Sequence, residues 1–252
     1  MNAALLALGH ERVPAAEATL VRNRDLLDIW DANHAQRITA AAPATIDRLL
    51  ARTNEVYAGS SHRRFDCDFT TPPAFESRLV RDGFHRRDFL VMLLEGEPHG
   101  RAGAADIRPC ADAAAWAGFT ALKVADWREL AGRLALPGHD EVGENLARAG
   151  RLRAPAVRYW LAYDGGAPCG FLSSWEGIDG VGQVEDLYVR PSSRGRGIAA
   201  ALLHHGIADA RRHGAKTVVI VADADDTPKA AYARMGWAPV AIKREYVRRV
   251  AP

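Results

Sequence analysis

The alternation of apolar and polar residues in the second half of the chain predicts an antiparallel sheet. Val157 to Tyr163, Gly170 to Trp175 and Gly182 to Val189 each read as strands. Between the first two lies Asp164 to Pro168, a sequence (DGGAP) that predicts a tight hairpin turn. Thr217 to Ala222 differs, because nearly all its residues are apolar or β-branched, as in a strand buried on both faces.

Helical patterns separate these strands. Asp112 is a suitable N-cap for a helix that we expect to end near Val124, and Asp140 to Ala149 predicts a second helix. The remaining expected elements are a strand at Ala104–Arg108, a loop with Pro137 and Gly138, a helix ending near Arg212, a helix at Pro228–Met235 and strands within Trp237–Val250. Antiparallel strands followed by a strand–helix–strand unit predict an α/β (α+β) fold, with a mixed central sheet flanked by helices.

The first 100 residues repeat part of this order. A helical stretch (Ile46 to Ala58), a strand (His62 to Phe69) and a helix (Ala74 to Phe84) parallel the last helix–strand–helix series at an offset of 153 to 155 residues. Matching elements at one offset predict a duplicated domain, although any α/β chain shows some coincidences of this kind. Glu95 to Ala104 has the glycine and proline content of a linker, so we expect two tandem domains, residues 1–100 and 101–252.

Composition narrows the class of protein. The formal net charge of +2 over 252 residues lacks the basic excess of many DNA-binding proteins, so we expect no nucleic-acid partner. No apolar run reaches about 18 residues, and no basic residue precedes the first apolar patch, so we expect neither a membrane span nor a signal peptide. Cys67, Cys110 and Cys169 show neither a disulfide nor a zinc spacing, which favours a cytoplasmic protein without a metal.

One loop carries most of the candidate chemistry. The sequence DLYVRPSSRGRGIAAALL, from Asp186 to Leu203, leads from a strand through a loop of glycines and arginines into a helix. The first amides of a helix are unpaired and carry partial positive charge, so an anion can bind there without any side chain. Gly195 and Gly197 would let a phosphate approach the backbone closely, and Arg194 and Arg196 would add charge that suits a pyrophosphate.

Two families of anion-binding loops compete for this sequence. Gly195-x-Gly197-x-x-Ala200 mimics the dinucleotide fingerprint, which leaves a nicotinamide-dependent oxidoreductase as a weak alternative. However, Arg194-x-x-Gly197-x-Ala199 resembles motif A of the GNAT superfamily of N-acyltransferases, which holds the pyrophosphate of acetyl-coenzyme A. The stretch AYARMGW, which ends at Trp237, is similar to a second motif of that family, and the order of elements after Ala104 also matches.

The resemblance implies roles for particular residues. The strand before the loop would splay from its parallel neighbour and bind the pantetheine arm through main-chain groups of Leu187, Tyr188 and Val189. The pyrophosphate would lie on the amides of the loop, from Arg194 through Gly195, Arg196, Gly197 and Ile198 to Ala199.

The resemblance also implies an acid and a base. Glu185 is the candidate base, with Asp186 a lesser rival, because alternation places Glu185 on the same strand face as Leu187. Tyr232 matches the family's tyrosine and would protonate the departing thiolate, since its ordinary pKa of ~10 keeps it protonated at neutral pH. Asp225 stands where the family often has Asn, so no role is assigned to it.

The N-terminal repeat lacks these features. Ala42 and Ala44, around Pro43, stand against the two glycines, and Leu79 stands against Tyr232. We therefore expect residues 1–100 to be a degenerate GNAT-like domain that neither holds the coenzyme nor catalyses. The whole chain is expected to be an acetyl-coenzyme A-dependent N-acetyltransferase acting on a primary amine of a small molecule or peptide. A non-catalytic acyl-coenzyme A sensor of the same fold is the alternative, and the oligomeric state is left open, with a homodimer among the options.

Overall fold

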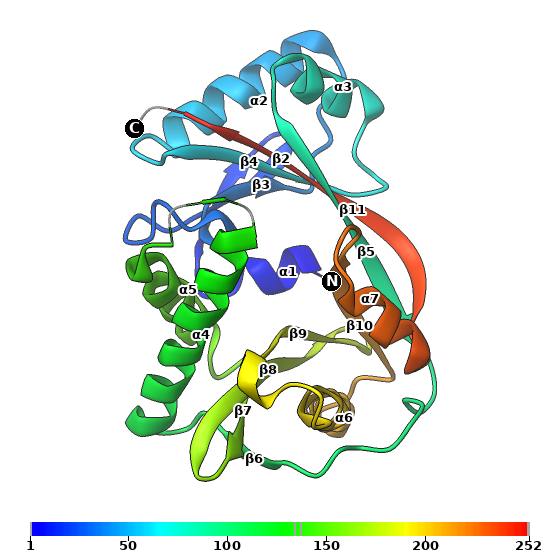
Figure 1. Cartoon of the computed structure of the whole chain (residues 1–252). Helices are drawn as coiled ribbons and strands as arrows, with labels where there is room; N and C mark the ends of the chain where they lie inside the picture. The colour runs from blue at the N-terminus through cyan, green and yellow to red at the C-terminus, as the bar shows by residue number, and fades with distance from the viewer. Residues whose placement is uncertain (1, 134, 137, 251–252) are drawn as a thin grey trace. The chain divides into compact units, whose positions relative to one another are not determined.

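The computed structural model describes residues 2–133, 135–136 and 138–250 and divides into two compact units. Unit 1 comprises residues 93–220 and 231–238, and unit 2 comprises residues 2–92, 221–230 and 239–250 of the described chain (Figure 1). Each unit contains a mixed sheet flanked by helices, so the predicted α/β class is confirmed. The domain boundary near residue 100 was placed from the repeat in the sequence, and it stays a prediction.

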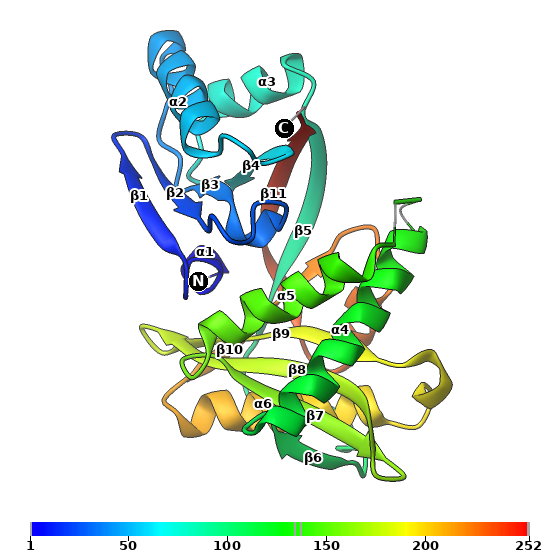
Figure 2. The ribbon, with the colours of Figure 1, turned by 90° about the vertical axis from the view of Figure 1, so that its left-hand side faces the viewer.

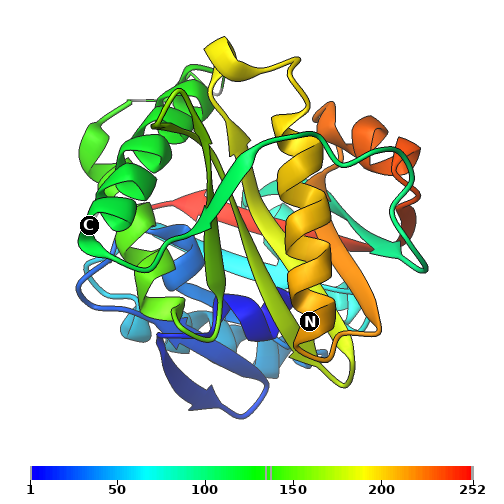
Figure 3. The same cartoon turned by 90° about the horizontal axis from the view of Figure 1, so that it is seen from below.

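Unit 1 holds the glycine loop. Its strands lie in the order β10-β9-β8-β7-β6, and only β9 and β10 run parallel among the pairs with a recorded register. Helices α4 and α5 lie side by side on one face of β7–β9, and α6 lies on the other (Figures 2 and 3). The elements are β6 Asp106–Pro109, α4 Ala113–Arg133, α5 Asp140–Arg153, β7 Arg158–Asp164, β8 Ala167–Ile178, β9 Val181–Val189, η2 Pro191–Ser193, α6 Ile198–Arg212, β10 Thr217–Asp223 and α7 Pro228–Arg234.

Helix α6 packs closely on the sheet because of its apolar side and one small residue. Its buried side chains recur at helical spacing along the face that contacts β8 and β9. A Cβ added to Gly206 would lie 2.3 Å from the side chain of Leu172 on β8, so a larger residue would force that side chain to move. Asp209, on the same helix, accepts hydrogen bonds from Arg158 on β7 (2.5 Å) and Ser174 on β8 (2.6 Å).

Unit 2 contains most of the N-terminal half and the last strand of the chain. Its strands lie in the order β1-β2-β3-β4-β11-β5, with β3 and β4 parallel. Helices α2 and α3 lie on one side of β4 and β11 (Figure 1), over a core that includes Phe65, Phe75 and Tyr246. The elements are α1 Asn2–Leu6, β1 Glu11–Ala15, β2 Ala18–Arg22, η1 Trp30–Ala32, β3 His34–Gln36, α2 Pro43–Val56, β4 His62–Cys67, α3 Pro73–Arg81, β5 His85–Leu94 and β11 Ala238–Arg249.

The two halves of the chain repeat one series of elements. The order α2-β4-α3-β5 recurs as α6-β10-α7-β11, and in each half the strand before the first helix pairs in parallel with the strand after it. The last strand departs from a simple tandem arrangement. Strand β11 pairs antiparallel with β4, from Arg244↔Cys67 to Arg249↔His62, so the C-terminal end of the chain completes the sheet of unit 2.

Most predicted elements are present, with three corrections. Helix α4 continues to Arg133 and does not end near Val124, because the residues that follow are good helix formers without a breaker. The first strand of this half begins at Asp106, two residues later than expected, and the predicted strands within Trp237–Val250 are one strand, β11. The loop at Pro137 lies outside the described residues.

Two local predictions are confirmed in detail. Asp112 caps α4, since its Oδ1 accepts a hydrogen bond from the amide of Ala115 (2.8 Å). Gly165 and Gly166 both have positive φ (55° and 81°) in the hairpin turn between β7 and β8, as a two-residue turn of this kind requires. Among the described residues, no helix has both the length and the apolar character needed to cross a lipid bilayer.

Candidate active site

The glycine loop ends in a helix start without a side-chain cap. Gly195 and Gly197 have φ of 75° and 78°, in the left-handed region that favours glycine. Gly197 is the N-cap of α6, and its carbonyl accepts the hydrogen bond of the Ala201 amide at 3.0 Å. Since no side chain caps this end, the amides of the first turn are open to an acceptor from outside the chain. A Cβ added to Gly195 would meet no atom within 4 Å, so the loop is open on that side.

The two loop arginines are engaged in ion pairs. Arg194 Nη2 lies 2.9 and 2.7 Å from the two carboxylate oxygens of Glu129 on α4, and its Nε donates to the carbonyl of Val189 at 2.9 Å. Arg196 pairs with Asp164 at the end of β7. These carboxylates hold both guanidinium groups beside the loop and offset part of their charge.

Strand β9, which leads to this loop, has a bulge in its middle. Phe171 of β8 lies opposite Tyr188, but Ser173 lies opposite Glu185, so β9 has one extra residue between these pairs. Asp186 lies in this extra segment with φ of 59°, an uncommon conformation for a residue other than glycine. A bulge of this kind redirects the side chains of a strand, and here it lies within the segment predicted to bind the pantetheine arm.

Strands β9 and β10 pair over a short length only. The recorded register covers three pairs, from Thr217↔Val181 to Val219↔Gln183. Within the described strands, the recorded register with β10 ends at Gln183, and the other edge of β9 pairs with β8 as far as Val189. Main-chain groups of Leu187 and its neighbours are therefore available on the β10 side.

Glu185 is half-buried beside the bulge. Its Oε1 accepts a hydrogen bond from Gln183 Nε2 at 2.7 Å, and its main-chain carbonyl accepts one from Ser173 Oγ at 3.2 Å. Gln183 is completely buried, so this contact fixes the carboxylate relative to the strand.

Lys123 and Asp126 on α4 form a charged cluster with Asp186 on β9 that the sequence analysis did not predict. The buried Lys123 donates from Nζ to Asp186 Oδ1 at 2.9 Å and lies 3.5 Å from Asp126 Oδ2, with its Nζ 5.0 Å from the ring centroid of Phe171. Burial would lower the pKa of Lys123, but the two carboxylates raise it above its ordinary value, so the lysine stays charged. Burial raises the pKa of Asp126. The i,i+3 spacing of Lys123 and Asp126 was a signal in the sequence, but the contact with Asp186 depends on the tertiary fold.

Tyr232 lies on α7 and is buried, with 7% of its surface exposed. Its ring lies 6.5 Å from that of Trp237, at an interplanar angle of 56°. Both residues belong to unit 1, like the glycine loop and Glu185. The two predicted catalytic side chains are therefore in the same compact unit as the candidate coenzyme loop.

The predicted linker also lies in unit 1. A Cβ added to Gly103 would lie 2.3 Å from the carbonyl oxygen of Gly197, so the linker backbone lies against this carbonyl, next to the start of α6 (Figure 3). The amide of His99 donates to the carbonyl of Met235 at 2.9 Å, and its ring lies against Gly236. The sequence signalled this segment only as a linker and gave no sign of these contacts.

Several aromatic side chains of this unit pack against one another. The ring of His205 lies 4.2 Å from that of Trp160, and the pair packs α6 on β7. Trp116 and Phe119 form an aromatic cluster with Tyr159, at centroid distances of 5.0–5.5 Å. Within the described part of the chain, no three His, Cys, Asp or Glu side chains are arranged to hold a metal ion.

Comparisons with known proteins agree with this geometry. Residues 116–237 match the sequence model of the Acetyltransferase (GNAT) family. No curated protein matches the chain significantly in sequence.

Solved structures share the fold at low sequence identity. A conserved protein of unknown function from Staphylococcus epidermidis has a TM-score of 0.74 and 13% identity, with 96% of this chain and 95% of that chain covered. A GCN5-related N-acetyltransferase from Kribbella flavida has a TM-score of 0.67 and 18% identity, with 96% and 90% covered. A tandem GNAT protein from the clavulanic acid biosynthesis pathway has a TM-score of 0.58 and 15% identity, with 87% and 76% covered.

Proposed function

Because residues 116–237 form a domain of the GNAT acetyltransferase family, we propose that the chain transfers an acetyl group from acetyl-coenzyme A to a primary amine. The observation that carries this proposal is the uncapped start of α6, which follows two glycines in the left-handed conformation. Residues 101–252 form the catalytic domain in this proposal, and residues 1–100 form a degenerate GNAT-like domain.

The loop residues fit the pyrophosphate of the coenzyme. The amides from Gly195 to Ala199 donate to its oxygens, and the partial positive charge of the α6 N-terminus stabilises its negative charge. Arg194 and Arg196 add positive charge from the rim of the loop, and their pairs with Glu129 and Asp164 orient them. The coenzyme supplies an acetyl group activated as a thioester.

The edge of β9 after its recorded pairing with β10 binds the extended arm of the coenzyme in this proposal. Leu187 and the amide of Val189 provide main-chain groups on the β10 side of the strand, since the carbonyl of Val189 already accepts a hydrogen bond from Arg194. An extended ligand that pairs with a free strand edge gains affinity from main-chain hydrogen bonds. The bulge at Asp186 changes the direction of the strand just before this segment.

Proton transfer requires a base and an acid. Glu185 accepts the proton of the attacking amine, directly or through a water molecule, since Asp186 is already held by Lys123. The amine nitrogen forms a bond to the acetyl carbon, the bond from that carbon to sulfur breaks, and Tyr232 donates its proton to the departing thiolate. The half-buried position of Glu185 and the buried position of Tyr232 both limit the access of water.

Calorimetric titration of the full chain with acetyl-coenzyme A, and separately with NAD(H) and NADP(H), tests the first step. We expect binding of one acetyl-coenzyme A per chain and no binding of the nicotinamide nucleotides. A screen of small amines and peptides for amine-dependent release of coenzyme A thiol then tests transfer. Binding without turnover on any amine would favour a non-catalytic acyl-coenzyme A sensor. The absence of binding would contradict both functions and leave only the GNAT-like fold.

A further inference from the structure

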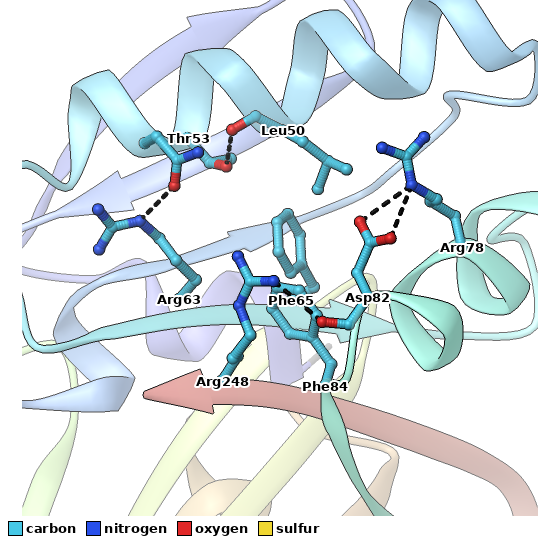
Figure 4. A pocket seen from close by; sticks show the side chains of 9 residues that line it. Leu50, Thr53, Arg63, Phe65, Arg78, Asp82, Phe84 and Arg248 are labelled. Atoms are coloured by element: carbon cyan, nitrogen blue, oxygen red, sulfur yellow. Dashed lines mark hydrogen bonds and ion pairs between the residues drawn. The ribbon is translucent and has the colours of Figure 1, made fainter. Parts of the chain in front are cut away.

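A cavity of about 180 Å³ lies in unit 2, whereas the residues assigned to acetyl transfer belong to unit 1 (Figure 4). Helix α2 and the end of α3 form its walls, and strands β4 and β11 form its floor. Its lining residues are Leu50, Thr53, Asn54, Arg63, Phe65, Arg78, Asp82, Phe84 and Arg248. Three of these are arginines and only one is an acid.

Two of the arginines lie directly opposite each other. Arg63 of β4 and Arg248 of β11 are partners in the antiparallel register, so their side chains project from the same face of the sheet. Like charges at directly opposed positions destabilise a sheet. Burial lowers the pKa of Arg63, and the charge of Arg248 lowers it further, as expected for a repulsive pair.

Neither of these arginines is neutralised by a carboxylate in the described chain. Arg63 is buried and donates only to neutral acceptors, namely the Asn54 side chain (2.8 Å) and the carbonyls of Ser60 (3.1 Å) and His62 (2.7 Å). Arg248 donates from Nη1 to the carbonyl of Asp82 at 2.9 Å.

The third arginine has carboxylate partners of its own. Arg78 Nε binds both carboxylate oxygens of Asp82 at 3.0 and 2.9 Å, and its Nη1 binds Asp47 at 2.5 Å. The acid in the cavity is therefore already engaged, and no carboxylate of the described residues pairs with Arg63 or Arg248.

The two guanidinium groups are also held in place, as a binding site requires. The guanidinium carbon of Arg248 lies 4.6 Å from the ring centroid of Phe84 (Figure 4), and the side chain of Asn54 on α2 accepts a hydrogen bond from Nε of Arg63 at 2.8 Å. Phe65 also lines the cavity. Orienting a guanidinium in advance lowers the entropy that is lost when it binds a ligand.

We propose that this cavity binds a small oxyanion, a carboxylate or a phosphate, between Arg63 and Arg248. The oxyanion offsets the repulsion between the two guanidinium groups and accepts charge-assisted hydrogen bonds from both. This site belongs to unit 2, which does not contain the glycine loop, and its existence does not depend on acetyl transfer.

Thermal unfolding of the full chain with benzoate, with inorganic phosphate, and with sodium chloride at equal ionic strength tests the proposal. We expect at least one oxyanion to raise Tm with the logarithm of its concentration above its Kd, by about 5–10 °C at 100 times its Kd, and beyond the effect of the chloride. The oxyanion that does so identifies the source of the ligand. No shift beyond the chloride control with either oxyanion would overturn the proposal.

Variants of the cavity arginines test whether the oxyanion binds in this cavity. Arg248→Gln is expected to weaken oxyanion binding at least about tenfold, measured by ligand-observed NMR. Arg249→Gln is the matched control, because this exposed arginine is the next residue of the same strand and points to the other face. Arg63→Gln should act like Arg248→Gln, but if this buried variant fails to fold, Arg248→Gln decides alone. Equal binding by wild type and Arg248→Gln, or displacement of the oxyanion by acetyl-coenzyme A, would also overturn the proposal.

Discussion

Helices α2 and α6 follow corresponding strands in the two repeated series, but their first turns are built differently. Helix α6 begins after Gly197, whose φ of 78° turns the backbone so that amides face an open loop. Helix α2 begins after Ala42, which has an ordinary extended conformation (φ −76°, ψ 144°), and its first residue is Pro43. Proline has no amide hydrogen, so the α2 start lacks one of the donors that an anion would use.

The two repeated series also differ at the position of the candidate acid. Tyr232 on α7 keeps 7% of its surface exposed, whereas Leu79 on α3 is fully buried in the core of unit 2. A hydroxyl at position 79 would have neither space nor access to a substrate. The repeated fold is therefore compatible with both an open and a closed helix start, and a few residues at the start of each helix decide between them.

The largest expected effect concerns the C-terminal strand, because unit 2 depends on it. A chain that ends at Ala238 loses the six residue pairs between β11 and β4, together with the buried Tyr246. A typical domain is stabilised by only ~5–15 kcal/mol, so we expect unit 2 to unfold when these contacts are lost. Hydrogen exchange of the β4 amides measures it, and a chain that ends at Val250 is the control. Protected β4 amides in the shorter chain would show that unit 2 folds without β11.

Adding a carboxylate at the N-cap of each helix is the most direct test of the comparison. Gly197→Glu places a carboxylate where the pyrophosphate is proposed to lie, and we expect a loss of acetyl-coenzyme A affinity of more than about 1,000-fold. Ala42→Glu, at the N-cap of α2, should leave the affinity unchanged. Gly214→Glu, beyond the other end of α6, controls for the cost of replacing a glycine with positive φ (111°). Calorimetry measures the acetyl-coenzyme A affinity of all three variants, and a reduced affinity in Ala42→Glu would contradict the comparison.

The N-terminal half should also be sensitive to acid through two buried histidines. Burial lowers the pKa of His34 and of His62 to about 4, so both are neutral in the folded chain. With an ordinary pKa of ~6.5 in the unfolded chain, each contributes up to about 3 kcal/mol that is present above pH ~6.5 and lost as the pH falls towards 4. We expect His34→Gln to reduce the loss of stability between these pH values.

Thermal unfolding of the wild type and of His34→Gln at several pH values measures this contribution. The exposed His139 provides the control variant, His139→Gln, which should keep the pH dependence of the wild type. An unchanged pH dependence in His34→Gln would mean that His34 does not govern the acid sensitivity.

The smallest effect is expected from the loss of one hydroxyl. Tyr232→Phe should lower turnover about 100-fold without changing the affinity for acetyl-coenzyme A, because it removes only the proposed proton donor. Tyr163→Phe removes a hydroxyl elsewhere in unit 1 and should leave turnover intact. Turnover equal to that of the wild type would remove Tyr232 from the mechanism.

The candidate site could be predicted in part because its signals are local. Glycines with positive φ, the Asp112 cap and the hairpin at Gly165 depend on residues close together in the sequence. The contact of Lys123 with Asp186 could not be predicted, since the two residues are 63 positions apart. The same holds for the contact of Gly103 with Gly197, and for Arg63 opposite Arg248.

The sequence by itself determined the α/β class, the repeated order of elements and the glycine loop before α6, because hydrophobic periodicity and backbone preferences act over a few residues. Only the tertiary structure decided which strands pair and which charges meet. Strand β11 follows the elements of the glycine-loop half in the chain, but it pairs with β4, since pairing depends on which strand edges are free when the sheet assembles. That pairing places Arg248 beside Arg63 and so creates the proposed oxyanion site.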